Sequence, residues 1–282
     1  MRGATLGVNV GILYVVATPI GNLEDMTFRA VRILREAALI AAEDTRTTRR
    51  LLAHFDIHTP LTSYHEYTEP AKIERLLDRL AEGDMALVSE AGMPGISDPG
   101  APLIAAAIRR GIRVVPVPGA SALLSALAVS GLPTDAFTYL GFLPRRPTDR
   151  RRAIEGAASL PYTLVWFETP HRLRDALADL QSILGDRPIA IARELTKFYE
   201  EIWRGSLAEA VVHFTQVEPR GEFTLVVGGA APAAAVWDEA AVRVALDAAV
   251  AAGKRGREAA RGVAQQAGWS TRDVYELLVK NP

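Results

Sequence analysis

The twelve residues from Ser89 to Gly100 combine the side chains and the backbone freedom that a ligand site needs. Three glycines and two prolines punctuate the segment, and Glu90 and Asp98 supply carboxylates. Glycine lets a backbone approach a ligand closely, whereas proline removes freedom that binding would otherwise have to freeze. An ordinary connection between a strand and a helix takes only ~2–6 residues. The segment follows a strand-like apolar run at 85–88, so it lies where open α/β sheets bind ligands.

A second segment of the same kind follows the strand-like run at 114–117. It begins with Pro118 and Gly119 and leads through Ala120 and Ser121 into a helix of small residues. The start of a helix presents free N–H groups and the positive end of the helix dipole. Ser121 fits a helix N-cap as well as it fits a ligand contact.

Polar side chains also follow the other strand-like runs of the first half. They are Asn22, Glu24 and Asp25 after the first run, Glu43, Asp44 and Arg46 after the second, and His65 and Glu66 after the third. One such pair alone is more simply a loop or capping feature. Their repetition at strand ends indicates a site.

Several common kinds of site are not supported by the sequence. It contains no G-x-x-x-x-G-K-[ST] phosphate loop, no G-x-G-x-x-G after the first strand-like run and no G-x-S-x-G elbow. Its five histidines lack zinc-ligand spacing, so no metal is expected. With no cysteine, disulfides, thiolate metal sites and a cysteine nucleophile are excluded.

The length of 282 residues predicts two domains and a small appendage, and the 49% hydrophobic content predicts a sizeable core. No apolar run approaches the ~18 residues of a membrane span, and the first residues lack the pattern of a secretory signal. We therefore expect a cytoplasmic protein that is not bound to a membrane.

Arginine is clustered although the net charge is only −1. The clusters are Arg46, Arg49 and Arg50; Arg145, Arg146, Arg150, Arg151 and Arg152; and Lys254, Arg255, Arg257 and Arg261. Each cluster alone is more simply a solvated surface. Together they favour a polyanionic partner such as nucleic acid.

The apolar periodicity divides the chain into regions. Strands are expected at 12–16, 39–42, 61–64, 85–88 and 114–117, with helices at 27–36, 49–54, 71–82 (closed by Gly83), 103–108 and 123–129. A break in composition covers 131–148. Strands at 162–167, 189–192, 201–205 and 222–227 follow, with helices at 173–184 and from 207. Beyond 240 the segments 257–266 and 271–279 have a helix-turn-helix rhythm, which a small packing module would share.

The predicted fold class is α/β with two α/β domains. We expect an N-terminal extension at 1–11, a domain with a mainly parallel sheet at 12–118 and a domain with a mixed sheet at 119–229. A small-residue linker at 230–239 and a helical tail at 240–282 complete the chain.

Seven blocks carry a resemblance to a known family: LYVVATPIGNLEDMTFRAVRIL, AAEDTRTTRRLL, LVSEAGMPGISDPG, VPVPGASALLSALAVSGLP, GFLPRR, ETPHRL and ARELTKFYEE. In this order, over about 12 to 229, they resemble the small-subunit rRNA 2′-O-methyltransferase I family of the tetrapyrrole-methylase superfamily. The resemblance implies two α/β domains of tetrapyrrole-methylase type, S-adenosylmethionine (AdoMet) as cofactor and a homodimer. It also implies methylation of the ribose 2′-OH of a cytidine in 16S rRNA, near the decoding centre of the 30S subunit.

The resemblance assigns AdoMet to two loops of the first domain and a wall of the second. The implied residues are Gly92, Met93, Pro94, Gly95, Ile96, Ser97, Asp98, Ala120, Ser121, Ala122, Phe167, Ala192 and Glu222. The implied rRNA contacts are Pro19, Asn22, Arg46, His65, Arg145, Arg146, Arg150, Arg151 and Arg152.

A ribose hydroxyl is a poor nucleophile and benefits from a base as its proton leaves. The candidate bases are Asp44, Glu66 and Asp25, in that order, with Arg46 pairing Asp44 or holding a phosphate. Asp44 and Arg46 also fit a structural ion pair. The chain departs from the family's H-E-H-N-E at Tyr67 and Thr68, so these two residues receive no role.

Two other functions remain open. A methyltransferase of a tetrapyrrole precursor would share the fold and AdoMet, but would act on carbon and has no use for three arginine clusters. An RNA-binding module without enzyme activity would explain the arginines, but leaves two elaborate loops without a role.

Overall fold

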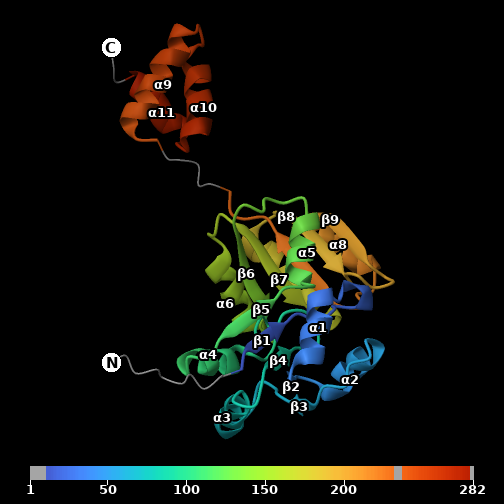
Figure 1. The fold of residues 1–282 in the computed structure, drawn as a ribbon. Coiled ribbons are helices and arrows are strands. Elements are labelled where there is room, and N and C mark those ends of the chain that lie inside the picture. The colour runs from blue at the N-terminus through green and yellow to red at the C-terminus, as the bar shows by residue number, and fades with distance from the viewer. Residues whose placement is uncertain (1–10, 232–236, 280–282) are drawn as a thin grey trace, which may run out of the picture. The chain divides into compact units, whose positions relative to one another are not determined.

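In the computed structural model, residues 11–231 and 237–279 are described (Figure 1). Most of the expected extension at 1–11 and the middle of the linker at 230–239 lie outside these ranges. The chain divides into two compact units. One contains both β-sheets and runs to Gly228, except for Ser159–Pro161, which belong with the C-terminal unit.

The first sheet is parallel throughout, as the alternation of strands and helices predicts. Its strands are β1 (Leu13–Val16), β2 (Leu39–Ala42), β3 (Leu61–Ser63), β4 (Met85–Val88) and β5 (Val114–Val117). They are arranged in the order β3-β2-β4-β1-β5. β2 and β4 are buried along their whole length, because helices cover both faces of the sheet.

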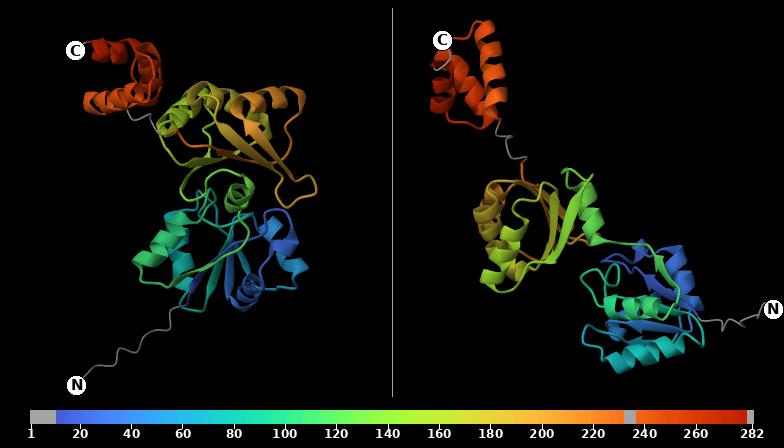
Figure 2. Two further views of the ribbon diagram at one scale, coloured as in Figure 1. Left: turned by 90° about the horizontal axis from the view of Figure 1, so that it is seen from above. Right: turned by 90° about the vertical axis from the view of Figure 1, so that its left-hand side faces the viewer.

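Two pairs of helices cover these faces (Figure 2). On one face, α1 (Phe28–Glu36) and α2 (Thr45–His54) bury Ile33, Leu34 and Leu52 against the strands. On the other, α3 (Pro70–Arg79) and α4 (Ala101–Arg109) bury Leu76 and Leu103. Apolar residues at three- and four-residue spacing produce these buried stripes.

The second sheet is mixed, also as predicted. It contains β6 (Phe137–Phe142), β7 (Thr163–Glu168), β8 (Pro188–Arg193), β9 (Glu201–Ser206) and β10 (Phe223–Val227) in the order β6-β7-β10-β8-β9. Only β6 and β7 pair in parallel. α6 (Pro147–Ala157), α7 (Leu173–Leu184) and α8 (Leu207–Gln216) lie side by side.

Helix α5 (Ala122–Val129) follows the last strand of the first sheet but packs on the second sheet. Ala126 and Leu127 join Val165, Ala190 and Val226 in one core cluster. This packing supports the proposed domain boundary after residue 118, which stays a prediction.

Local elements differ from expectation at three places. The segment 131–148, expected to be a break, contains β6 and the start of α6. Its turn-rich composition does not predict a strand, and β6 forms by pairing with β7. α2 begins four residues early, at Thr45, because the Asp44 side chain caps it. α3 ends at Arg79, so the prediction that Gly83 closes this helix is wrong.

The expected helical tail is present as three helices: α9 (Glu239–Ala251), α10 (Gly256–Ala267) and α11 (Thr271–Val279). Val242, Leu246, Val263 and Val274 form part of their own core. Among the helices of the described residues, none is long and apolar enough to cross a bilayer.

Candidate functional site

The site is built on the carboxyl edge of the first sheet. Val16 of β1 lies opposite Val88 of β4 and Val117 of β5, so these three strands end at one level. Just beyond this level, Thr18 and Gly92 pair through N···O contacts of 2.9 and 3.0 Å. The loop after β1 and the loop after β4 are therefore joined by main-chain hydrogen bonds.

The loop after β4 depends on glycine where its backbone turns. Gly92 and Gly95 have φ of +82° and +83°, which favour glycine. A Cβ on Gly92 would lie 3.6 Å from Ile20 Cγ2 and 3.9 Å from the Ala120 carbonyl oxygen. Gly92 thus stands where three loops meet. Ser97 has φ of +61° without being glycine, a strained conformation that often marks a functional position.

Ser97 links this loop to the second sheet. Its hydroxyl is hydrogen-bonded to the Tyr139 hydroxyl on β6. The Tyr139 ring packs edge-to-face on Phe167 of β7, with 5.3 Å between ring centroids. Tyr139 thus connects Ser97 and Phe167, two residues of the predicted cofactor set, although the sequence did not indicate Tyr139 itself.

Beside them, Glu168 is buried at the end of β7. One oxygen, Oε1, accepts from Arg172 at 2.6 Å and from the Thr169 N–H at 2.7 Å. The same Arg172 donates to the Leu143 carbonyl at 2.9 Å. This ion pair anchors the end of β7 to the chain that leaves β6.

The loop after β5 lies next to the loops of β1 and β4. A Cβ on Gly119 would lie 3.0 Å from Ala17 Cβ, so a side chain there would press on the loop after β1. Ser121 is the N-cap of α5 and accepts from the Leu124 N–H at 3.4 Å. Ala122 is the first residue of α5, so this helix begins directly after the loop of β5 at the carboxyl edge of the first sheet.

Carboxylates gather at the same edge. Burial raises the pKa of Asp98 to about 7, and the nearby charge of Glu43 adds to the shift. Burial also raises the pKa of Glu43, which accepts from the Glu90 N–H at 3.3 Å and is near the charge of Glu66. Part of this carboxylate set is thus kept protonated to a higher pH than usual.

Asp44 has the opposite environment. Its carboxylate accepts from the side chain and the backbone N–H of Arg46, which lowers its pKa. This is the capping and ion-pair arrangement that the sequence left open. Arg46 remains 85% exposed and free to meet a partner on its outer side.

The other predicted substrate residues lie in neighbouring loops. Asn22 caps a 3-10 turn, Leu23–Asp25, by accepting from the Glu24 N–H at 3.0 Å. Asp25 has one buried carboxylate oxygen without a partner among the described residues. His65 is exposed, and its backbone N–H donates to the Thr68 hydroxyl at 2.8 Å. Pro19 directly follows the Thr18–Gly92 pair.

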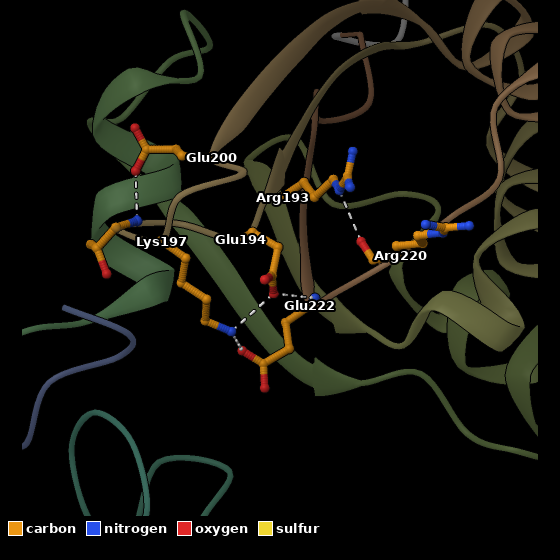
Figure 3. A network of polar contacts seen from close by, with 7 residues as sticks. Arg193, Glu194, Lys197, Glu200, Arg220 and Glu222 are labelled. Carbon is orange, nitrogen blue, oxygen red and sulfur yellow. Dashed lines mark hydrogen bonds and ion pairs between the residues drawn. The ribbon is translucent and has the colours of Figure 1, made fainter.

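An ion-pair network next to the ends of β8 and β10 contains Glu222 (Figure 3). Lys197 Nζ lies 2.9 Å from both Glu194 Oε1 and Glu222 Oε2. A Cβ on Gly21 would meet Lys197 Cγ at 2.4 Å, so the stem of this lysine lies against the loop after β1. Ala192, by contrast, is 3% exposed in the core under α5, so only its main chain can meet a ligand.

The arginine cluster on α6 divides into two kinds. Arg150 and Asp179 form an ion pair at 2.7 Å, and their side chains are only 5% and 6% exposed. The prediction that Arg150 contacts RNA is therefore wrong, because its guanidinium is buried between α6 and α7. Arg151 shares Asp179 but stays 61% exposed, and Arg145, Arg146 and Arg152 are exposed.

Among the described residues, no group of three or more histidine, aspartate or glutamate side chains is arranged to hold a metal ion.

Comparison with known proteins identifies the family. The model of the tetrapyrrole (corrin/porphyrin) methylases matches residues 12–211. A protein of Halalkalibacterium halodurans named ribosomal RNA small subunit methyltransferase I is 50% identical over 95% of this chain and 94% of its own. A protein of Synechocystis with the same name is 46% identical over 96% of this chain and 98% of its own. The chain belongs to the ribosomal RNA small subunit methyltransferase I family, within the tetrapyrrole methylases.

Solved structures agree with this fold. The chain is similar to a cobalt precorrin-4 methyltransferase with a TM-score of 0.61 and 18% identity, over 80% of this chain and 98% of the other. It is also similar to a uroporphyrin-III C-methyltransferase of Thermus thermophilus complexed with S-adenosylhomocysteine. That likeness has a TM-score of 0.51 and 24% identity, over 77% of this chain and 97% of the other. The family resemblance and the fold class expected from the sequence are both confirmed.

In this family member, sequence reasoning missed Tyr139, Arg172 and Lys197 as parts of the site. Arg172 and Lys197 stand within blocks that carried the resemblance, but their partners lie in other elements. Tyr139 lies in the segment 131–148, whose composition predicts a break. The one available signal was an aromatic run, Phe137 to Phe142, with the alternation of a strand.

The raised pKa of Asp98 predicts a stability that depends on pH. Because folding favours the protonated carboxyl, the folded state loses stability as the pH rises from the ordinary aspartate pKa of about 4 to about 7, and the loss is constant above pH 7. With allowance for partial exposure, Asp98→Asn should be more stable than the wild type by about 1–2 kcal/mol at pH 8. This gain should shrink as the pH falls to 4.

Urea unfolding at pH 8, 6 and 4 measures this difference. The exposed Asp175→Asn on α7 is the matched control. A difference between Asp98→Asn and the wild type that stays constant over this range would contradict the assigned environment of Asp98.

Proposed function

We propose that this chain transfers a methyl group from AdoMet to the ribose 2′-OH of a cytidine in 16S rRNA, near the decoding centre. The observation that carries the proposal is the near-full-length similarity to proteins named ribosomal RNA small subunit methyltransferase I. The meeting of three strand-end loops at one edge, where α/β proteins bind ligands, supports it.

The residues present fit AdoMet. Glycine at 92 keeps open the point where the loops of β1, β4 and β5 meet. The N-terminus of α5 offers N–H groups and a positive dipole end to a carboxylate. The segment from Gly92 to Asp98, the residues Ala120 to Ala122 and the ring of Phe167 would hold the cofactor. When bound, AdoMet supplies a methyl group activated by a positively charged sulfur.

The chain itself must position the hydroxyl and accept its proton. Methyl transfer relieves the charge on sulfur, so catalysis depends more on alignment than on charge stabilisation. The hydroxyl proton leaves as the new carbon–oxygen bond forms, which is work for a general base. The carboxylates near Glu43 supply candidates.

The pKa values reorder these candidates. A base is most effective when its pKa is close to the working pH. The pKa of Asp98 is about 7, whereas Arg46 lowers the pKa of Asp44. We therefore place Asp98 first, keep Glu66 and Asp25 as alternatives, and assign Asp44 to orienting Arg46.

The rRNA would lie across the loops that carry Pro19, Asn22, Arg46 and His65, with Arg145, Arg146, Arg151 and Arg152 contacting its phosphates. Exposed arginines are suited to phosphate because their planar guanidinium donates two parallel hydrogen bonds. A folded 30S particle, a homodimer and a cytoplasmic location complete the proposal.

Ile96 tests the cofactor loop without disturbing the core, because it is 47% exposed. Ile96→Lys places a positive charge where AdoMet is expected and should weaken its affinity at least ~10-fold. Calorimetric titration of AdoMet into both proteins measures this. Ile108→Lys, on an α4 residue that is 61% exposed, is the control and should bind as the wild type does. Equal affinity of all three proteins would remove AdoMet from this loop.

The methylated product tests the reaction. The protein is incubated with 30S subunits that lack the modification and with AdoMet labelled on its methyl group. After digestion of the 16S rRNA to nucleosides, the label should appear in 2′-O-methylcytidine. Label in a base, or on an added tetrapyrrole but not on RNA, would contradict the proposal. Binding of 30S subunits without any label in RNA would favour a module without enzyme activity.

Asp98→Asn tests the base. The wild-type kcat should rise with pH, reach half its maximum near pH 7 and level off above it, because the carboxyl must be ionised to accept a proton. At an AdoMet concentration that calorimetry shows to saturate the variant, the variant should lose this rise and about 10²-fold in kcat. Asp44→Asn should keep the pH dependence. A wild-type profile in Asp98→Asn would transfer the role to another carboxylate.

A further inference from the structure

Two neighbouring aromatic side chains, Phe198 and Tyr199, project into solvent from the segment between β8 and β9. Phe198 is 93% exposed and Tyr199 is 67% exposed. Their rings contact each other edge-to-face, with 5.0 Å between centroids. Such exposure is unfavourable for a phenylalanine, and paired exposed aromatic rings mark interaction sites.

The segment that carries the rings is held by a network of polar contacts (Figure 3). Lys197 bridges Glu194 and Glu222, and the Thr196 N–H donates to Glu200 Oε2 at 2.6 Å. Glu194 and Thr196 have φ of +48° and +67°, a strained conformation for residues other than glycine. Such strain persists only where the surroundings enforce it, and it gathers at binding and active sites.

The same segment contacts the predicted substrate face. The stem of Lys197 lies against Gly21, next to Asn22 and the turn that contains Asp25. Lys197 therefore ties the base of the aromatic pair to the loop that we assign to the rRNA. The two carboxylates that follow Tyr199 in the sequence have partners within the protein. Glu200 accepts from the Thr196 N–H, and Glu201 pairs with Arg193 at 3.2 Å.

We propose that Phe198 and Tyr199 form a stacking platform for an unpaired base of the rRNA substrate. This inference rests on the proposed function. Proteins that bind folded RNA specifically mostly contact unpaired nucleotides, whose bases can leave the stack. Proteins bind unstacked bases on aromatic rings, and a backbone segment that is fixed before binding loses little freedom. Phe198 has no polar group, so stacking on its ring contributes affinity and does not read the identity of the base.

A double variant, Phe198→Ala with Tyr199→Ala, tests the platform in the full chain. It should raise KM for 30S subunits and weaken their equilibrium binding about 10-fold. Both kcat and the affinity for AdoMet should stay near the wild-type values. Tyr162→Ala is the matched control, because this tyrosine is 49% exposed at the opposite end of β7 from Phe167.

Conservative variants separate stacking from simple apolar contact. Phe198→Trp with Tyr199→Phe keeps both rings and should bind 30S subunits as the wild type does. Phe198→Leu with Tyr199→Leu keeps apolar side chains without rings and should behave as the alanine variant does. Wild-type KM in the alanine or leucine variant would overturn the proposal. So would a change in the oligomeric state of the alanine variant in light scattering, because the rings would then belong to a contact between copies.

Binding and methylation are measured separately, so the two proposals can fail independently. Ring-dependent binding of 30S subunits without methyl transfer by the wild type would support the platform and refute the proposed reaction. Methyl transfer with ring-independent binding would do the reverse.

Discussion

The parallel pairing of β1 with β4 and β5 is the constraint on which the site depends. Parallel strands in this register finish at one edge, so Val16, Val88 and Val117 end side by side. The loops that follow them start only a strand spacing apart, about 5 Å. The Thr18–Gly92 hydrogen bonds and the contact of Gly119 with Ala17 are consequences of this register. A shift of one residue in β4 would separate these partners and reverse the faces of the strand.

The second sheet is tied to this edge by contacts of different kinds. Helix α5 leaves the first sheet and buries Ala126 and Leu127 against β7, β8 and β10. Ser97 bonds Tyr139 on β6, and Lys197 packs against Gly21. One tie is apolar, one is a hydrogen bond and one is the stem of a charged side chain. Because the ties are distributed, the loops are positioned from several directions before any ligand binds, and binding then has less freedom to remove.

The same edge carries an electrostatic cost. Glu43, Glu90 and Asp98 lie close enough for their charges to affect one another, and burial adds to the effect on Glu43 and Asp98. Carboxyl pKa values that are shifted by burial and by neighbouring charges cluster at functional sites in proteins. Arg150 and Asp179, by contrast, form a buried ion pair in which each charge has its partner. Burial therefore favours the protonated form of Glu43 and Asp98, whereas the ion pair of Arg150 and Asp179 joins α6 to α7.

The amino-acid sequence by itself determined the fold class, the strands of both sheets except β6, and the position of the glycine-rich loop. Helix α7 begins and ends at the predicted residues, Leu173 and Leu184, and α11 spans the predicted 271–279. These features depend on periodicity and on glycine and proline, which act over a few residues and can be read locally. Seven sequence blocks also sufficed to indicate the family.

Only the tertiary structure decided which side chains meet. Strand β6 needed β7 as its partner, and Arg150 became a buried ion pair because Asp179 faces it from α7. Ser97 and Tyr139 are 42 residues apart, and Lys197 and Glu222 are 25 residues apart. The pKa of Asp98 depends on burial by elements from several parts of the chain. Contacts and burial of this kind arise from packing between distant segments, which no local pattern encodes.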